Sequence, residues 1–466
     1  MRTPKLSTTL LFLSTSGILL LTAVSLQDYV NRKAPEPYMD EIFHVRQAQT
    51  YCNGNYHIWD PKITTPPGLY VTSTILSKVP TQGIGCTTDS LRAHNLLFLT
   101  GTFAVLVVLL RTLHPRETSS KNSIVHAFTL SLFPISYFFH LVYYTDPGST
   151  FLVLLAYLAS LHGYHAGSAA IGLVAVTFRQ TNVIWVMFIA GVAAMNMLSQ
   201  RQPPSRTFNH IKMAQIDGPG GIWNLLSSFV VTAISRFGVL LSTVWPYVCV
   251  GASFVGFVFW NKGIVLGDRS NHIATIHVPQ LYYYISTLLG FSFLSCDILG
   301  ALSALAAQLN IVFLVSAVST ALFMGWTISM FTIEHPFLLA DNRHYSFYIW
   351  KNIFRRHALS RYAVVPGYLF AFWACGRQLA TSQPVILVIL YLVSTVATLI
   401  PTPLFDFRYY IIPFLMYRIH ITPPRTAVLV AEALIYILIN LGTIYLFGER
   451  PFVWKSEQGA LQRFMW

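Results

Sequence analysis

Long apolar blocks recur along almost the whole chain, and they constrain the fold more than any other feature of the sequence. The blocks lie near residues 9–26, 93–112, 123–142, 149–163, 167–178, 181–198, 237–259, 281–297, 303–330, 362–377, 383–400 and 425–447. Most are close to the length, about 17 to 25 residues, at which a helix crosses the hydrocarbon of a bilayer. Because lipid offers no hydrogen bonds to an open backbone, we expect an all-α integral membrane protein with about 12 spans, in a range of about 10 to 14.

The composition is that of a membrane protein rather than a soluble one. Of the 466 residues, 54% are hydrophobic and 10% are charged, whereas roughly a quarter of a soluble domain is charged. The net charge is +13, but the basic residues lie mainly in short connections beside the apolar blocks. Such residues orient spans and contact anionic lipid, so we expect membrane lipids as partners and no nucleic acid.

The charge pattern predicts the topology of a single membrane domain over residues 1–466. The first block is longer than a usual signal core and lacks a clear cleavage pair, so we expect a retained span rather than a signal peptide. With the N-terminus in the cytosol, residues 27–92 form a large extracytosolic loop and residues 200–236 a cytosolic linker. Cys52 and Cys86 share that loop, and whether they pair in an oxidising compartment is left open.

Two adjacent carboxylates, Asp40 and Glu41, lie in the predicted 27–92 loop. A sugar-transfer enzyme needs one carboxylate that accepts the proton of the attacking hydroxyl group, while a second polar group orients the sugar. Acidic residues also cap short helices at their N-terminal ends. Spacing alone does not separate the catalytic interpretation from the structural one.

A second polar group of residues lies between two long apolar blocks, on the same predicted side of the membrane. It contains Lys262, Asp268, Arg269 and His272. The cationic side chains could bind a lipid phosphate at the interface, where charge-assisted hydrogen bonds are strong. The alternative is that Asp268 and Arg269 form an ion pair that only holds the loop together.

Two further motifs place an acidic residue two positions before an arginine, with aromatic residues around the pair. One contains Asp341, Arg343 and His344, and the other contains Asp406 and Arg408. Clusters of this kind often anchor helix ends at the lipid headgroups. Anchoring is therefore the alternative to a role of these residues in binding substrate.

Motifs for nucleotide or zinc chemistry do not occur in this sequence. It contains no P-loop, no GxGxxG motif and no zinc-ligand spacing, so the folds that these motifs indicate are not expected. Nothing in the sequence requires a cofactor, and we assign no metal ligands. Whether a divalent metal takes part in the chemistry is left open.

Five segments of the chain together resemble one known family. They read PYMDEIFH, QAQTYCNGNYHIWDPKITTPPGLY, GIVLGDRSNHIATIHVPQLYY, HPFLLADNRHYSFYIWK and DFRYYIIPF. These segments closely resemble the Die2/Alg10-type family of endoplasmic-reticulum α-1,2-glucosyltransferases, which use dolichyl phosphate glucose. The similarity is spread over nearly the whole chain, and its longest segments are too specific to arise from membrane composition.

The resemblance implies a multi-span glycosyltransferase of the GT-C class, in the endoplasmic reticulum membrane with its catalytic loop in the lumen. The donor would be dolichyl phosphate glucose, and the acceptor a diglucosylated dolichyl-pyrophosphate oligosaccharide. The product would carry the terminal α-1,2-linked glucose that protein N-glycosylation uses. Because the donor is β-linked and the product α-linked, the resemblance implies one displacement with inversion.

The resemblance also implies roles for individual residues in these segments. The catalytic acid would be Asp40 or Glu41, and Asp40 is preferred. Contacts to the donor and its phosphate would come from Lys262, Asp268, Arg269, His272, Arg343, His344 and Arg408. Contacts to the acceptor would come from His44, Trp59, Asp60 and Tyr70.

Two alternative functions are consistent with many of the same residues. Another lipid-linked-sugar glycosyltransferase, such as a mannosyltransferase, would share the base and the phosphate contacts and differ in its acceptor pocket. A lipid transporter or flippase would also line an intramembrane cleft with acids and arginines. The pseudo-symmetric halves that would support a transporter are not visible in this sequence.

Overall fold

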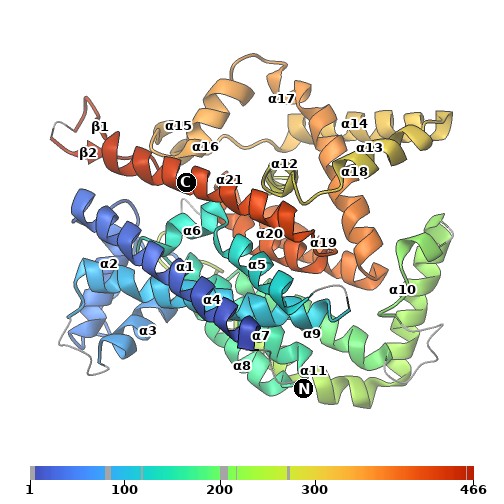
Figure 1. The fold of residues 1–466 in the computed structure, drawn as a ribbon, viewed down its shortest axis with the longest axis horizontal. Helices are drawn as coiled ribbons and strands as arrows, with labels where there is room; N and C mark the ends of the chain where they lie inside the picture. Colours follow the sequence, from blue (N-terminus) through green and yellow to red (C-terminus); the bar gives the residue numbers. More distant parts are fainter. Residues whose placement is uncertain are drawn as a thin grey trace. The chain divides into compact units, whose positions relative to one another are not determined.

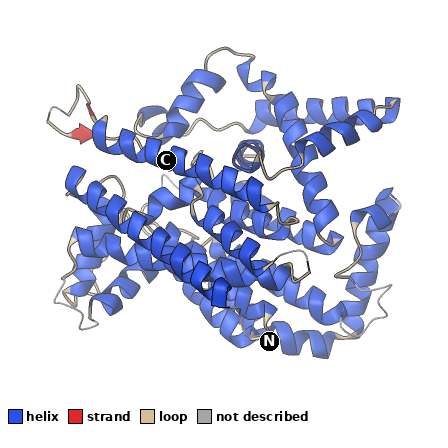
Figure 2. Cartoon of the chain, in the orientation of Figure 1, coloured by secondary structure: helices blue, strands red, loops and turns tan. Residues whose placement is uncertain are grey.

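The chain is built almost entirely of helices (Figure 2). The computed structural model describes residues 6–78, 85–116, 119–199, 208–216, 218–269, 273–457 and 459–466. The structure is 73% helical. Within the described ranges the only strands are β1, Phe452–Val453, and β2, Leu461–Gln462, which form one short antiparallel pair. The expectation of an all-α membrane protein is confirmed.

The chain divides into two compact units, each formed by segments that are distant in the sequence. Unit 1 consists of Met1–Ala193, Leu241–His272 and Arg425–Arg463. Unit 2 consists of Ala194–Leu240, Ile273–Pro424 and Phe464–Trp466. From the sequence we expect one membrane domain, which stays a prediction; apolar blocks recur in both units.

Unit 1 is a bundle arranged around one long helix, α4. Its helices are α1 Leu6–Lys33, α2 Glu41–Cys52, α3 Gly68–Ser77, α4 Thr88–Leu113, α5 Ser120–Ser131, α6 Pro134–His140, α7 Asp146–Leu161, α8 His165–Phe178, most of α9 Asn182–Ser199 and of α11 Phe237–Asn261, and α21 Thr426–Glu449. Helices α1, α5 and α7 pack against α4, and α8 packs against α7 (Figure 1). Leu99, Phe103 and Leu106 of α4 are fully buried in these contacts.

Unit 2 is a set of shorter helices that pack mainly on α18. Its helices are α10 Gly218–Ser235, α12 Gln280–Ser292, α13 Ile298–Ala307, α14 Ile311–Phe331, α15 Pro336–Ala340, α16 Tyr345–Ile349, α17 Ser360–Ala363, α18 Val365–Ser382, α19 Val385–Leu399 and α20 Ile411–His420. Single turns of other helix types are η2 Met213–Gln215, η3 Trp350–Phe354 and η4 Phe407–Tyr410. Tyr282 of α12 stacks on Tyr368 of α18 with ring centroids 5.5 Å apart, and α13 and α14 also pack on α18.

Local sequence signals break two of the expected spans. The 123–142 block forms α5 and α6 rather than one helix, because Pro134 has no backbone N–H and begins a new helix. The 303–330 block is divided between α13 and α14, and the side chain of Asn310 caps α14 by accepting the N–H of Phe313 at 2.9 Å. A block of span length is therefore not always one span.

Six described helices are long and apolar enough to cross a membrane. They are Leu6–Lys33, Thr88–Leu113, Asn182–Ser199, Phe237–Asn261, Ile311–Phe331 and Thr426–Glu449. Shorter apolar helices occur at Asp146–Leu161, His165–Phe178, Ile298–Ala307 and Val385–Leu399. The chain is thus a multi-pass membrane protein, and the count of about 12 spans stays a prediction.

The two segments that were expected to be loops contain helices. The segment after the first block is shorter than 27–92, because α1 continues to Lys33, and it holds both α2 and α3. Cys52 and Cys86 form a disulfide across it, with Cα atoms 6.5 Å apart. Of the expected 200–236 linker, residues 218–235 form α10, and residues 200–207 and 217 lie outside the described part of the chain.

Candidate active site

Glu41, the first residue of α2, carries a carboxylate that is fully buried and fully hydrogen-bonded. The guanidinium of Arg92 on α4 donates to both of its oxygens, from Nε to Oε1 at 2.9 Å and from Nη2 to Oε2 at 2.7 Å. Two main-chain N–H groups complete the set, that of Tyr143 at 2.6 Å and that of Tyr38 at 3.1 Å. Glu41 therefore organises the surrounding backbone.

Arg92 extends this network to the end of α1. Its Nη1 donates to Asn31 Oδ1 at 2.9 Å and to the Ala34 carbonyl at 2.8 Å, and its Nη2 donates to the Glu36 carbonyl at 3.3 Å. A buried ion pair is stable only when its remaining polar atoms are also satisfied. Here they are, so the pair fixes the turn that connects α1 to α2.

Asp40 lies at the end of this fixed turn and differs from Glu41 in its surroundings. It occupies the N-cap position of α2, but its side chain makes no cap hydrogen bond to the helix, and the residue is partly exposed. Its N–H donates to the hydroxyl of Tyr144 at 3.3 Å. Met39 before it has a φ of 56°, a left-handed conformation that is uncommon for a residue with a side chain.

Aromatic side chains line the turn after Asp40. Nδ1 of His44 is 2.6 Å from the hydroxyl of Tyr70, and the ring of Trp59 meets that of Tyr70 edge-on at 5.9 Å. Tyr51 also packs edge-on against Tyr70, at 6.0 Å. Tyr70 is fully buried and His44 nearly so, whereas Trp59 is partly exposed. Of these expected acceptor contacts, only Trp59 presents an accessible ring.

Asp60 is held next to Trp59 by the side chain of Gln47. The Gln47 amide oxygen accepts the N–H of Asp60 at 2.8 Å, and its amide nitrogen donates to the carbonyl of Ile58 at 2.8 Å. Asp60 Oδ1 in turn accepts the N–H of Lys62 at 2.9 Å. Gln47 is buried and Asp60 partly exposed, so a rigid turn displays the Trp59 ring and the Asp60 carboxylate together.

The segment that contains Lys262, Asp268 and Arg269 packs against the chain that follows Trp59 and Asp60. The N–H of Asp268 donates to the Pro61 carbonyl at 2.7 Å, and that of Leu266 donates to the Thr64 carbonyl at 3.2 Å. Between them Gly267 has a φ of 66°, and a Cβ atom there would lie 2.3 Å from the Pro61 oxygen. Only glycine fits this close approach.

Lys262 and Arg269 are exposed at the end of α11. Lys262 has a φ of 55°, the left-handed conformation that ends many helices. Arg269 Nη2 donates to the Asn261 carbonyl and, at 2.9 Å, to Asn261 Oδ1. The Arg269 guanidinium therefore caps α11 and keeps a charge at this surface, while His272 lies outside the described residues.

A cavity of about 410 Å³ lies in unit 1, between this turn and helices α8 and α11. Trp59 and Pro66 line it from the turn, Gln180 from the segment after α8, and Phe257 and Trp260 from α11. The amide of Gln180 donates to the Thr64 carbonyl. Ligand cavities are commonly apolar with a few polar groups, and this one has that character.

In unit 2, the two acid–arginine motifs adopt the same local structure. The N–H of Arg343 donates to Asp341 Oδ1 at 3.0 Å, and its Nη2 donates to Asp341 Oδ2 at 2.7 Å. The N–H of Arg408 donates to Asp406 Oδ1 at 2.9 Å, and its Nε donates to Asp406 Oδ2 at 2.7 Å. Each arginine is thus fixed by the carboxylate two residues before it. We call these two structures the Asp-x-Arg turns.

Electrostatics keep both turns ionised. Burial raises the pKa of Asp341, but the hydrogen bonds from Arg343 and the charge of His344 lower it by more, so the net pKa is below the ordinary value. Burial also raises the pKa of Asp406, and Arg408 together with His344 lowers it by more. The charge of His344 thus lowers the pKa of both carboxylates, and its Nε2 is 3.9 Å from Asp341 Oδ2. The structure thus brings Arg343, His344 and Arg408 together within unit 2.

Sequence reasoning missed two arginines that position the Asp40 turn. Arg92 immediately precedes an apolar block and reads as an ordinary boundary residue. Arg463 Nη1 donates to the Phe447 carbonyl at 2.8 Å, and its N–H donates to the Tyr38 hydroxyl at 2.7 Å. The sequence offered one signal for such an arginine: two adjacent carboxylates, Asp40 and Glu41, need a cationic partner if either of them is buried.

Within the described residues, no three His, Cys, Asp or Glu side chains are grouped so that they could hold a metal ion.

Asp146 is nearly buried and forms an ion pair with Arg179. Both residues lie in unit 1 and lock the start of α7 to the end of α8. Asp146 is therefore a structural acid in this arrangement.

Comparison with known proteins identifies relatives over nearly the full length of the chain. A human protein named Dol-P-Glc:Glc(2)Man(9)GlcNAc(2)-PP-Dol alpha-1,2-glucosyltransferase is 39% identical over 452 residues, which are 94% of each chain. Proteins of the same name from Arabidopsis thaliana and Candida albicans are 32% and 31% identical, and the matches cover 97% and 94% of this chain. No solved structure matches the chain.

The model of one protein family matches most of the sequence as well. It is the DIE2/ALG10 family, and the match covers residues 34–419. That range contains the Asp40 turn, the Gly267 loop and both Asp-x-Arg turns. The chain therefore belongs to the DIE2/ALG10 family.

Proposed function

We propose that this protein transfers glucose from dolichyl phosphate glucose to the diglucosylated dolichyl-pyrophosphate oligosaccharide, forming the terminal α-1,2 linkage. The names of its relatives state this donor, acceptor and linkage, and the human relative matches over 94% of both chains. We further propose that it acts in the endoplasmic reticulum membrane with Asp40 on the lumenal side. The predicted topology and the Cys52–Cys86 disulfide support that side, because disulfides persist in oxidising compartments.

The reaction is a single displacement with inversion at the anomeric carbon. The 2-hydroxyl oxygen of the acceptor glucose forms a bond to C1 of the donor glucose, while the bond from C1 to the phosphate oxygen breaks. A carboxylate takes the hydroxyl proton, and dolichyl phosphate leaves with the bonding electrons. The protein must therefore supply one accessible base and positive charge at the departing phosphate.

Asp40 is the residue that we propose as the base, and the single observation that carries this is the contrast between the two carboxylates. Glu41 has no exposed surface and accepts hydrogen bonds at both oxygens. Asp40 is partly exposed and its side chain does not cap α2. A base must reach the proton that it abstracts. Glu41 is then a positioning residue, which holds the turn through Arg92.

We propose that Arg343, His344 and Arg408 of unit 2 bind the donor phosphate. Lys262 and Arg269, which are exposed beside the Trp59 turn in unit 1, stay candidates from the sequence for contacts to the donor. Arginine forms paired hydrogen bonds with phosphate oxygens, so each can neutralise charge as the phosphate departs. His272 and Asp268 stay candidates from the sequence for the same region.

The acceptor sugar is proposed to lie on the turn formed by Trp59 and Asp60. The partly exposed indole ring offers a flat apolar face, and the adjacent carboxylate can accept hydrogen bonds from sugar hydroxyls. His44 and Tyr70 lie behind this surface and support it. We also propose that transfer requires no divalent metal, and it should then persist in excess EDTA.

The proposal is tested by giving purified protein in detergent a set of defined substrates. Dolichyl phosphate glucose with the diglucosylated acceptor should yield one added glucose, which an α-1,2-specific glucosidase removes. Dolichyl phosphate mannose, or the monoglucosylated acceptor, should yield no product. A mannosyl product would support the other lipid-linked glycosyltransferase function. Movement of donor across vesicles without transfer would support a flippase.

A further inference from the structure

The last residues of the chain pair with the segment that carries Arg343. The N–H of Met465 donates to the Arg343 carbonyl at 3.0 Å, and the N–H of Tyr345 donates to the Met465 carbonyl at 3.1 Å. His344 and Met465 thereby form a parallel bridge, and Met465 is buried. The main chain on both sides of His344 is therefore fixed by residues 464–466.

The same tripeptide fixes the imidazole of His344. Nδ1 of His344 is 2.8 Å from the main-chain oxygen of Trp466, which can only accept, so Nδ1 donates. Nε2 on the other side of the ring is 3.9 Å from Asp341 Oδ2. An imidazole held at one nitrogen has a defined orientation for the other. The direction in which His344 presents Nε2 thus depends on the position of Trp466.

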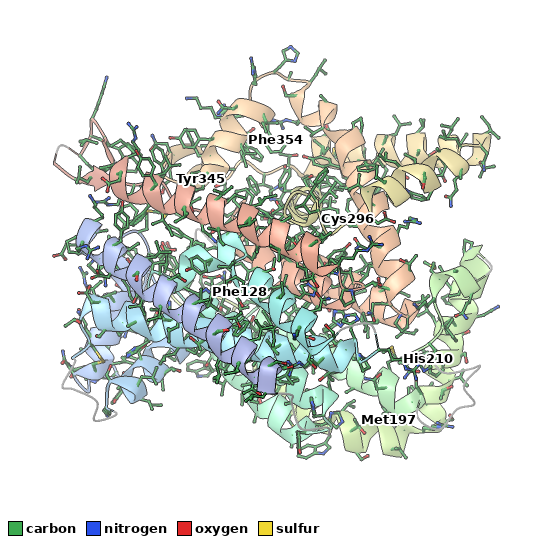
Figure 3. The ribbon with its side chains drawn as sticks, viewed as in Figure 1. Phe128, Met197, His210, Cys296, Tyr345 and Phe354 are labelled. Atoms are coloured by element: carbon green, nitrogen blue, oxygen red, sulfur yellow. A yellow bond between two sulfur atoms is a disulfide. The ribbon has the colours of Figure 1, made fainter. Side chains whose placement is uncertain are left out.

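The indole of Trp466 contacts the second Asp-x-Arg turn and the segment that directly follows the first. Its ring meets Tyr345, which follows Arg343 and His344, at 5.1 Å between centroids, and it meets Phe407 at 5.7 Å. Phe407 is the middle residue of the second turn. Figure 3 labels Tyr345, and Figure 1 marks the C-terminal end of the chain in the same part of the view. One side chain therefore packs on Phe407 of the second turn and on Tyr345, two residues after Arg343 of the first.

The hydrogen bonds inside each turn do not set the position of one turn relative to the other. Each arginine is bound by its own aspartate within three residues, which is a local constraint. Two arginines that bind one phosphate must also be held at a fixed distance from each other. If they are not, binding must order them, and this cost weakens the affinity. A rigid aromatic ring between the turns provides that constraint.

We propose that Phe464–Trp466 is a positioning element for the cations of the Asp-x-Arg turns, with Trp466 as its central residue. It touches no substrate in this assignment. It keeps Arg343, His344 and Arg408 arranged for one phosphate group, and without it each turn persists but the pair is no longer preorganised. This inference rests on the proposed phosphate-binding role of those three residues.

The test compares Trp466→Ala with Trp466→Phe in the full-length protein. W466A should raise the donor KM by about tenfold, as expected when a remote change displaces binding groups. The acceptor KM should stay within twofold of wild type. W466F keeps a flat ring on Tyr345 and Phe407, so it should restore most of the donor affinity. Leu461→Ala is the matched control, since Leu461 is exposed in the same C-terminal segment.

A second readout does not depend on transfer. Dolichyl phosphate should raise the melting temperature of wild type and L461A, and the shift should be reduced in W466A. If wild type bound dolichyl phosphate but transferred no glucose, the proposed function would be contradicted, while this comparison would still decide the role of Trp466. An unchanged donor KM and an unchanged thermal shift in W466A would overturn the inference. So would equal increases in donor and acceptor KM, which indicate a general structural effect. If W466A does not fold, W466L replaces it and the same two results decide.

Discussion

Arg92 and Glu41 form an ion pair without solvent exposure, in which the guanidinium donates to both carboxylate oxygens at 2.9 and 2.7 Å. The residue next to Glu41 is Asp40, which is partly exposed. It follows Met39, whose φ of 56° is uncommon for a residue with a side chain. A buried pair that is this completely satisfied holds the adjacent turn in one conformation. The position of the proposed base is therefore determined by a pair that does not take part in the chemistry.

Replacing Arg92 by methionine should destabilise the protein rather than only reduce its activity. Methionine fills most of the volume but leaves the Glu41 carboxylate buried without its partner, which costs about 3 to 5 kcal/mol. Thermal unfolding in detergent measures the loss. Arg46→Met is the control, because Arg46 is exposed on α2. Equal melting temperatures for R92M and R46M would contradict the structural role of the pair.

Replacing Gly267 by alanine should reduce transfer by at least about tenfold, because it combines a left-handed φ with a close contact. The new Cβ atom would lie 2.3 Å from the Pro61 oxygen and 2.5 Å from the Ile63 oxygen. The loop that carries Arg269 must then move away from the Trp59 turn. Gly263→Ala is matched, since a Cβ there meets only ordinary contacts at 3.8 Å. Similar rates of transfer by both variants would disprove the steric argument.

Replacing Arg408 by glutamine should raise the donor KM by about 10-fold to 100-fold, the value of one charge-assisted hydrogen bond. The acceptor KM should change little, because the substitution removes a cation and not a sugar contact. Initial rates at varied donor and fixed acceptor give both constants. Arg355→Gln serves as the control, since Arg355 is exposed and lies 3.7 Å from Glu334. A larger effect on the acceptor KM would reassign Arg408.

Stability should fall with pH between about 6.5 and 4, in part because of His277. Burial lowers the pKa of His277 to about 4, against an ordinary value of 6.5. The folded state therefore favours the neutral ring. Above pH 6.5 the ring is neutral in both states and does not lower the free energy of unfolding. As the pH falls from 6.5 towards 4, the unfolded state binds a proton that the folded state does not, and the free energy of unfolding falls by about 2 to 3 kcal/mol.

The measurement is the melting temperature at intervals from pH 7.5 to pH 4.5. His277→Gln should flatten this dependence, whereas His357→Gln, at an exposed position, should retain it. The pKa values of Asp341 and Asp406 are below 3.8, so the loss of their ion pairs is confined to lower pH. An identical slope in H277Q and wild type would show that His277 does not titrate on unfolding in this range.

The sequence identifies the Asp40 turn, the Gly267 loop and both Asp-x-Arg turns, because each contains an acidic residue within a segment that resembles the family. It does not distinguish Asp40 from Glu41, since that difference depends on Arg92, which is 51 positions from Glu41 in the sequence. Likewise, the pairing of Met465 with Arg343 joins segments that no local pattern connects. Side-chain partners across long separations follow from tertiary packing, which hydropathy and spacing do not encode.

Helix boundaries were predictable only where the local signal is strong. The apolar run of α4 begins near the predicted block, and Thr87 caps the helix by accepting the N–H of Ser90 at 3.3 Å. By contrast, the break at Pro134 lies inside the 123–142 block, which reads as one apolar segment from end to end. Hydropathy therefore cannot tell one long helix from two short ones in this block. Only Pro134, which has no backbone N–H, indicates that a new helix begins there.

The assignment of the base is tested most directly by Asp40→Asn beside Glu41→Gln, with Glu36→Gln as an exposed control in the same segment. The rate of a single transfer is measured with donor and acceptor both saturating, together with the melting temperature. D40N should lose about 100-fold to 10,000-fold in rate, the usual contribution of a general base, and keep the wild-type melting temperature. E41Q should melt at a lower temperature. Transfer by D40N at the wild-type rate would contradict the central claim that Asp40 accepts the proton.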